Sequence, residues 1–157
     1  MKRRYLFTLE IVPLYVGRIY NKLPSHLTLM SRFLSRLSPE ELAEKVQPLF
    51  METEPVSLLL GETTQLGPKK VIAHMVDSSG ERRLHNNLCK LLDRIEAEYQ
   101  YPDFIGHGHK PHITEREGMQ FTPGSRRVSA AAYLIEVVEK KRVVRAKLEL
   151  AAARNKS

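Results

Sequence analysis

Two short stretches decide how this chain is organised: PHIT at residues 111–114 and SHLTL at residues 25–29. Each contains a histidine, an aliphatic residue and a threonine in that order. Successive side chains of a β-strand point to opposite faces, so the histidine and threonine of each copy share a face while the aliphatic residue points to the core. The copies lie about half a chain apart. If the two halves fold as similar lobes that face each other, the copies meet across a cleft, which brings together His26, Thr28, His112 and Thr114.

The composition is that of a globular protein. The chain has 157 residues, of which 42% are hydrophobic and 27% charged, which suits one domain with its own core. We expect a single domain over residues 1–157, built of two lobes that correspond roughly to residues 1–76 and 77–157. The single cysteine, Cys89, excludes an internal disulfide framework and favours a reducing compartment. It falls in a helical pattern, where a small core residue is the simplest interpretation.

The charge balance indicates the kind of partner. The formal net charge is +7 and the sequence pI is about 9.6, which favours polyanions such as nucleic acid or nucleotides. The basic start followed by an apolar run could be taken for a signal peptide, but Glu10 and Pro13 interrupt the run. No segment reaches the roughly 18 apolar residues that a membrane span needs. We therefore expect a cytoplasmic monomer with no membrane association.

Periodicity predicts an alternation of strands and two helices. Period-2 patterns predict strands over residues 5–12, 26–33, 55–63, 69–76, 112–116, 128–138 and from about 144 to 150. A capping box that begins at Ser38 predicts a helix over 39–51, and an apolar face predicts a second helix over 81–100. Residues 14–23 fit either a short helix or a loop. Residues 151–157 read as a frayed tail.

Several side chains are placed by this pattern. In the strand at 26–33, residues 26, 28, 30 and 32 share one face. His74 is predicted to be a packed or rim histidine, and His85 is placed on the surface. The loop at 101–110 carries Tyr101 and Phe104, which are candidates to stack on a base. Tyr5 and Phe7 are better explained as core residues.

Two imidazoles on opposite sides of a phosphate can break a P–O bond. Histidine has an unperturbed pKa of about 6.5, so one ring can accept a proton from the attacking oxygen while the other donates one to the leaving oxygen. Each such proton transfer typically contributes about 10²–10⁴ in rate. The two threonine hydroxyls can donate hydrogen bonds to the remaining phosphate oxygens. This chemistry requires neither a metal nor another cofactor.

With these motifs the sequence resembles the two-histidine phosphoesterases, which include the 2′-5′ RNA ligase-like proteins and the RNA cyclic phosphodiesterases. The resemblance rests on residues 25–29 and 110–114 and, in order and spacing, extends over nearly the whole chain. It implies an α+β fold that is bilobal, with two pseudo-symmetric antiparallel sheets around a central cleft and helices outside. It also implies metal-independent action on 2′,3′-cyclic phosphates or 2′-5′ linkages of RNA or nucleotides.

The resemblance also assigns roles to residues. His26, Thr28, His112 and Thr114 inherit the catalytic roles. For opening of a cyclic phosphate, we assign water activation to His112 and protonation of the leaving oxygen to His26, although the roles depend on how the substrate lies. Lys110 and Arg116 have the strand parity of His112 and Thr114, so they flank the cleft as substrate-binding candidates or are solvated charges at the strand ends.

One position departs from the family pattern. Members usually carry an aliphatic residue after the second threonine, where this chain has Glu115. The parity of the strand turns Glu115 away from His112 and Thr114, so no catalytic group is lost.

Three alternatives remain open at this stage. A domain of the same fold can bind RNA or nucleotides without turnover. His107, His109 and His112 form an H-x-H-x-x-H pattern that is compatible with a metal hydrolase, although such a site usually needs a carboxylate or cysteine partner and leaves His26 and Thr28 unexplained. Finally, two His-x-Thr strands can occur by chance in an unrelated α+β domain.

Overall fold

The computed structural model describes residues 1–151, so most of the tail expected at 151–157 lies outside the described residues. The strands are β1 (Arg3–Leu9), β2 (Ile19–Tyr20), β3 (Leu27–Ser35), β4 (Val56–Leu66), β5 (Val71–Asp77), β6 (Glu98–Tyr99), β7 (His112–Thr114), β8 (Arg126–Ser129), β9 (Ala131–Val138) and β10 (Lys141–Glu149). The helices are α1 (Pro39–Met51) and α2 (Ser79–Arg94), and two short 3-10 turns lie at 102–104 and 106–108. None of the helices in this part of the chain is long and apolar enough to span a membrane.

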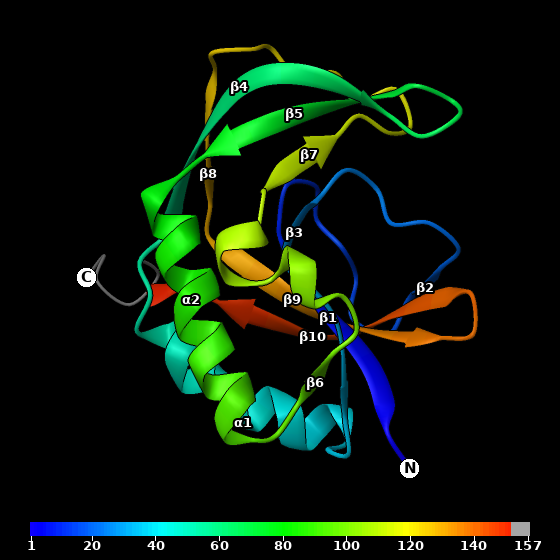
Figure 1. Cartoon of the computed structure of the whole chain (residues 1–157), viewed down its shortest axis with the longest axis vertical. Helices are drawn as coiled ribbons and strands as arrows, with labels where there is room; N and C mark the ends of the chain where they lie inside the picture. Colours follow the sequence, from blue (N-terminus) through cyan, green and yellow to red (C-terminus); the bar gives the residue numbers. More distant parts are fainter. Residues whose placement is uncertain (152–157) are drawn as a thin grey trace.

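The strands form one continuous antiparallel path in the order β2-β10-β9-β1-β3-β7-β5-β4-β8, with β6 added to β3. The predicted α+β class with antiparallel strands is therefore confirmed. Its two halves are visible in Figure 1, where β4, β5, β7 and β8 lie above β1, β3, β9 and β10. Within residues 1–151, strand pairing joins the two halves of the sheet only where β3 meets β7.

The two halves of the sheet do not coincide with the expected division of the chain near residue 76. β1 pairs with β9 and β3, and β9 pairs with β10, so one half combines strands from both ends of the chain. The other half likewise joins β4 and β5 to the later strands β7 and β8. Antiparallel pairing permits strands that are distant in sequence to lie side by side, because a strand can pair with any neighbour that the loops can reach.

Local signals set the start of both helices. In α1, the Ser38 side chain accepts a hydrogen bond from the Glu41 amide at 3.2 Å, and the Glu41 carboxylate accepts one from the Ser38 amide at 3.0 Å. This is the predicted capping box, and the predicted bounds of α1 are confirmed. In α2, the Ser78 hydroxyl accepts a hydrogen bond from the Glu81 amide at 3.1 Å.

The second helix is shorter than its apolar period predicts. It ends at Arg94, and Glu96 then adopts a left-handed backbone with φ of +58°. The turn lets Glu98 and Tyr99 pair with Leu34 and Phe33 at the edge of β3. The expectation of a helix to residue 100 is wrong because strand pairing is available there. Ile95 and Tyr99 still pack against the core, which is why the helical pattern seemed to continue.

The main core lies between the sheet and the two helices, which sit together on one side of it (Figure 1). Apolar side chains of α1 and α2 pack there against β1, β3 and β7, including Leu42, Val46, Leu84, Leu88, Phe7, Leu27 and Ile113. A second cluster forms where residues between β1 and β3 pack on β9 and β10; it includes Leu14, Leu23, Tyr133, Ile135 and Val144. The predicted core positions of Tyr5 and Phe7 are confirmed, because both are fully buried.

The register of β3 changes in its middle. Thr8 of β1 faces Thr28, whereas Phe7 faces Met30 and Tyr5 faces Phe33, so β3 has two extra residues over this span. These bulges disrupt the simple alternation of faces. Met30 is buried in the main core instead of sharing the face of His26 and Thr28. Ser31 and Arg32, although adjacent in sequence, both line the same cavity as His26 and Thr28.

The junction of β3 and β7 should be sensitive to the loss of apolar volume. Replacing the fully buried Ile113 by alanine is expected to lower the free energy of unfolding by about 2–5 kcal/mol. The matched control is Ile72→Ala on β5, where the side chain is 41% exposed and the expected change is under about 1 kcal/mol. Urea unfolding at pH 7 measures both. Equal effects of the two substitutions would contradict the assignment of Ile113 to the core.

Candidate active site

The two His-x-Thr copies lie on adjacent strands. Leu27 of β3 pairs with Ile113 of β7 in antiparallel register, which sets His26 beside Thr114 and Thr28 beside His112. Leu27 and Ile113 are fully buried on the core side. Side chains directly opposite each other in an antiparallel pair share a face, so the four motif side chains belong to the other face. The predicted meeting of the two copies thus arises from direct strand pairing.

Ser25 extends this junction beyond the ladder. Its buried hydroxyl donates a hydrogen bond to the Thr114 carbonyl at 2.7 Å and accepts one from the Arg116 amide at 3.1 Å. A side chain therefore supplies contacts that a longer β3 would supply with its backbone. These two bonds hold the residues after Thr114 against the residues before His26.

Both catalytic candidates among the histidines are oriented in the same way. His26 Nδ1 lies 2.8 Å from the Pro24 carbonyl oxygen, and His112 Nδ1 lies 3.1 Å from that of Lys110. A carbonyl oxygen only accepts hydrogen bonds, so each Nδ1 carries the proton. In the neutral ring, Nε2 is then the atom that can accept a proton. The pseudo-symmetry of the motifs therefore extends to the tautomer.

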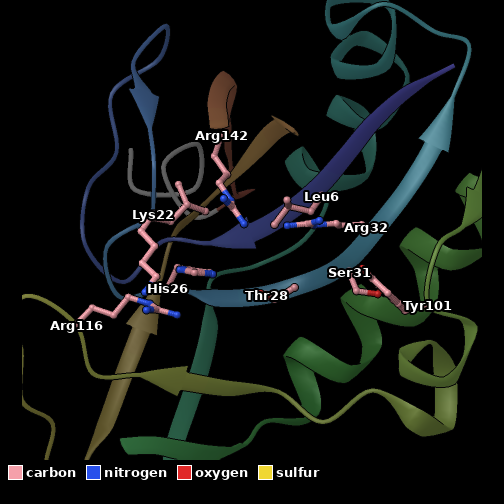
Figure 2. A pocket seen from close by; sticks show the side chains of 10 residues that line it. Leu6, Lys22, His26, Thr28, Ser31, Arg32, Tyr101, Arg116 and Arg142 are labelled. Carbon is pink, nitrogen blue, oxygen red and sulfur yellow. The ribbon is translucent and has the colours of Figure 1, made fainter. Parts of the chain in front are cut away.

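Two adjoining cavities lie along the histidines. One, of about 310 Å³, contains His26, and the other, of about 480 Å³, contains His112. Thr28 and Ser31 line both, so the two cavities are parts of one cleft. Figure 2 shows the first, with His26 and Arg116 at one end and Arg32 and Tyr101 at the other.

The two cavities differ in chemistry. The His26 cavity is lined by four cationic side chains, Lys22, Arg32, Arg116 and Arg142. The His112 cavity includes a single lysine, Lys110, and three apolar side chains, Leu66, Met75 and Phe104. Both substrate-binding candidates, Lys110 and Arg116, therefore lie at the cleft. Thr114 is buried and lines neither cavity, although it is the strand neighbour of His26.

The basic surroundings affect His26. Burial of the ring, opposed by the hydrogen bond to Pro24 and aided by the positive charges of Arg116, His112 and Arg142, lowers the pKa of His26 from 6.5 to about 4. His26 is therefore neutral at pH 7 in the free protein, with Nε2 unprotonated.

The loop at 101–110 places aromatic side chains at the cleft. Tyr101 lines the His26 cavity and Phe104 the His112 cavity. Both are exposed, and their ring centroids are 6.2 Å apart. Of the four aromatic residues considered from the sequence, these two are thus available to a ligand.

Three residues of α2 hold that loop. Arg82 donates hydrogen bonds to the carbonyls of Gly106 and His109, both at 2.9 Å. The carboxylate of Glu81, which is fully buried, lies 2.5 Å from His109 Nε2. The rings of His85 and His109 stack with centroids 3.8 Å apart. The loop therefore depends on buried polar contacts to the helix.

The prediction that His85 lies on the surface is wrong. His85 is fully buried; its Nδ1 donates to the Leu29 carbonyl at 2.7 Å, and its Nε2 accepts from the Gly106 amide at 3.0 Å. The helical pattern failed here because the neighbouring loop covers this face of α2 and supplies partners for a polar ring. Burial lowers the pKa of His85 to about 4.

His74 and Glu115 form a pair away from the cleft. His74 is buried and its Nε2 lies 2.8 Å from the Glu115 carboxylate, which also accepts a hydrogen bond from the Phe121 amide at 3.2 Å. The hydrogen bond from His74, followed by that from Phe121, lowers the pKa of Glu115. His74 is thus a packed histidine, as predicted. Its imidazole is the hydrogen-bond partner of Glu115, the residue that departs from the family pattern.

The H-x-H-x-x-H pattern does not form a metal centre. His107 is exposed, His109 is paired with Glu81, and His112 faces the cleft. Within residues 1–151, no group of three or more His, Cys, Asp or Glu side chains is arranged to hold a metal ion.

Sequence reasoning missed three polar or charged residues that line the His26 cavity. Lys22 comes from the loop before β3 and Arg142 from the start of strand β10, and neither belongs to a recognisable motif. Strict alternation along β3 predicts that Ser31 lies on the face opposite His26 and Thr28. Its side chain reaches the cleft because the register of β3 shifts near Met30. Arg32 was placed on the correct face by parity, which was the one available signal.

Comparisons with known proteins agree with this architecture. A family model described as the 2′-5′ RNA ligase superfamily matches residues 10–145. A solved phosphoesterase structure has a TM-score of 0.57 at 18% identity, covering 96% of this chain and 99% of the other. The protein TT0787 of Thermus thermophilus has a TM-score of 0.57 at 20% identity, with 94% and 98% covered.

A third similar structure is E. coli LigT complexed with 3′-AMP, with a TM-score of 0.55 at 16% identity and with 96% of this chain and 99% of LigT covered. At these identities the solved structures establish similarity of fold. No curated protein matches the chain significantly.

Protonation of His85 should make folding sensitive to acid. The unfolded chain binds a proton at His85 below about pH 6.5, whereas the folded protein does so only near pH 4. Stability should therefore fall as the pH falls through this window, by up to about 1.4 kcal/mol per pH unit for this group. His85→Gln is expected to reduce the slope of unfolding free energy between pH 6.5 and 4.5. The exposed His107→Gln is the control, and an unchanged slope in both variants would contradict the burial effect.

Proposed function

The chain belongs to the 2′-5′ RNA ligase superfamily, and from this membership we propose that it is a metal-independent phosphodiesterase acting on 2′,3′-cyclic phosphates or 2′-5′ linkages of RNA or nucleotides. The observation that carries the proposal is the pairing of two identically oriented histidines on adjacent strands. Each ring donates through Nδ1 to the carbonyl two residues earlier in the chain and lines the same cleft. Nε2 of each ring is left for proton transfer.

The environment of His26 supports its role as the general base. This reverses the assignment made from sequence, in which His26 protonates the leaving oxygen. A ring that is neutral at pH 7 is ready to accept a proton, and the surrounding positive charge disfavours its protonated form. His112 then acts as the general acid.

For a cyclic phosphate the reaction proceeds as follows. A water oxygen forms a bond to phosphorus while His26 Nε2 takes its proton. The bond between phosphorus and one ribose oxygen breaks, and protonated His112 donates its proton from Nε2 to that oxygen. The product is a phosphomonoester. In this scheme the base and the acid act on opposite sides of phosphorus, as in-line displacement requires, and they come from two neighbouring strands.

Four further side chains are assigned to the phosphate. Thr28 lines both cavities and can donate a hydrogen bond to a phosphate oxygen as negative charge builds up. Thr114 is assigned the matching role beside His26. Lys110 and Arg116 supply positive charge at the His112 and His26 ends of the cleft.

A nucleotide ligand also suits the loop at the cleft. The faces of Tyr101 and Phe104 are accessible, and stacking on an aromatic ring holds any base. Within the same fold, LigT has been solved with 3′-AMP, a nucleotide that carries its phosphate on the ribose. We propose an RNA end or a cyclic nucleotide as the substrate, and we place the protein as a monomer in the cytoplasm.

Replacing either catalytic histidine should abolish most turnover. His26→Ala and His112→Ala are each expected to lower kcat/KM for a 2′,3′-cyclic nucleotide by 10² or more, because each removes one proton transfer (about 10²–10⁴). The assay is hydrolysis in EDTA, with a 2′-5′-linked dinucleotide as the second substrate. His107→Ala, an exposed histidine outside both cavities, is the matched control.

Other outcomes separate the alternatives. Tight nucleotide binding by the wild type without product from either substrate would indicate a binding module. Loss of wild-type activity in EDTA would indicate a metal hydrolase.

The pH dependence should reveal the unusual state of His26. As the pH falls through about 4, His26 takes up a proton and can no longer act as a base. The kcat/KM of the wild type should therefore stay high down to about pH 5 and fall below it, well under the ordinary imidazole range of about 6.5. Circular dichroism at each pH verifies that the protein is folded. An acidic limb centred near 6.5 would refute the assignment.

A further inference from the structure

The His26 cavity holds more positive charge than one scissile phosphate needs. Lys22, Arg32, Arg116 and Arg142 line it, and no aspartate or glutamate of residues 1–151 does so. None of the four forms a salt bridge within those residues. A phosphodiester carries about one negative charge, so three of these cations are in excess. Like charges gathered in a cavity destabilise each other unless an anion is bound.

Arg142 shows this repulsion and is also held in place. Its Nη1 donates hydrogen bonds to the carbonyls of Asn21 at 3.0 Å and Lys140 at 2.9 Å. Burial, followed by the charges of Arg32 and Arg116, lowers its pKa. A guanidinium fixed by two carbonyls among other cations is preorganised for an anionic ligand.

Two further polar atoms at the cavity have no partner in the protein. Arg116 Nε and Ser31 Oγ are buried and make no hydrogen bond within residues 1–151, yet both side chains line the cavity. Buried donors are normally satisfied. In a cavity lined by cations, the acceptor that best suits both atoms is an anionic oxygen.

The cations are spread along the cavity. Arg116 lies with His26 at one end, whereas Arg32 lies with Tyr101 at the other, and Arg142 reaches in between (Figure 2). Thr28 and Arg32 are four residues apart on β3, which corresponds to about 10–13 Å along a bulged strand. Charge-assisted hydrogen bonds to phosphate span only about 2.7–2.9 Å. One phosphate between the histidines therefore uses the Arg116 end and leaves the Arg32 end without an anion.

We propose that Arg32, Arg142 and Ser31 form a subsite for a second phosphate of the same substrate. The inference rests on the proposed function, in which the scissile phosphate lies between His26 and His112. The second phosphate belongs to the ribose 5′ position, either as a terminal monoester or as the diester that links to the preceding nucleotide of an RNA chain. The substrate class is thereby narrowed from any ribose cyclic phosphate to a 5′-phosphorylated nucleotide or an RNA 3′ end.

Equilibrium binding tests this subsite without turnover. The ligands are adenosine 3′-phosphate, adenosine 3′,5′-bisphosphate and the dinucleotide ApAp, measured by titration calorimetry at fixed ionic strength. The wild type should bind the bisphosphate about tenfold or more tighter than the monophosphate, since a charged hydrogen-bonded contact typically contributes that much. An equal gain for ApAp identifies the linking diester as the source, and a gain for the bisphosphate alone identifies a terminal phosphate.

Arg32→Gln and Arg142→Gln should each bring the ratio of the two dissociation constants close to one. Arg36→Gln is the matched control, because it removes the same charge from an exposed residue just beyond β3 and outside the cavity. Thermal unfolding shows whether each variant is folded. The proposal is overturned if the wild type binds mono- and bisphosphate equally, if it binds neither, or if the ratio survives in both variants.

Binding and turnover separate the two proposals. If the protein binds the bisphosphate more tightly than the monophosphate but hydrolyses no cyclic phosphate, the subsite is supported and the proposed activity is refuted. If the protein hydrolyses cyclic phosphates but binds the two ligands equally, the proposed activity is supported and the subsite is refuted.

Discussion

The site depends on one short contact, the pairing of Leu27 with Ile113 between β3 and β7. This pair joins the two halves of the sheet, and its buried side chains tie the junction to the core beneath the helices. The same pair turns the histidine and threonine of each motif to the face opposite the core, where His26, Thr28 and His112 line the cleft, since alternate side chains of a strand face opposite ways. Ser25 strengthens the junction with two hydrogen bonds across it. The geometry of the candidate site and the continuity of the sheet thus depend on the same structural element.

Local symmetry is combined with an asymmetric environment. Both histidines donate through Nδ1 to a carbonyl two residues earlier. The His26 cavity, however, is lined by four cations and no carboxylate, whereas the His112 cavity has one lysine, one aspartate and three large apolar side chains. An imidazole among positive charges resists protonation. In the proposed mechanism, equivalent residues take different roles because strands and loops from distant parts of the chain surround each one differently.

The loop between α2 and β7 owes its position to buried polar groups. Glu81, Arg82 and His85 of α2 contact His109 or the backbone near Gly106. These contacts set Tyr101 and Phe104 beside the cleft. Satisfied polar groups in a low-dielectric interior define a geometry more narrowly than apolar packing does. The aromatic side chains available to a base are consequently placed by residues that lie outside the cleft.

Sequence alone was sufficient for what short-range periodicity encodes. The capping box at Ser38 predicted the start of α1, alternation predicted most strands, and the two His-x-Thr stretches indicated the family and the residues at the centre of the cleft. These features follow from neighbours a few positions apart, where backbone geometry leaves few choices. The same reasoning went wrong where distant segments compete with the local pattern, as at the end of α2 and at His85.

Only the tertiary structure decided the rest. It combined strands from both ends of the chain in one half of the sheet and strands from the middle of the chain in the other, and it brought Lys22 and Arg142 to His26 from segments with no motif. It also turned Ser31 to the cleft through a bulge in β3. Such features arise from pairing and burial between residues that are remote in sequence, and their energy depends on the whole packed arrangement. The histidine pair that we propose as catalytic is thus readable from the sequence, whereas the charge that surrounds His26 is a property of the fold.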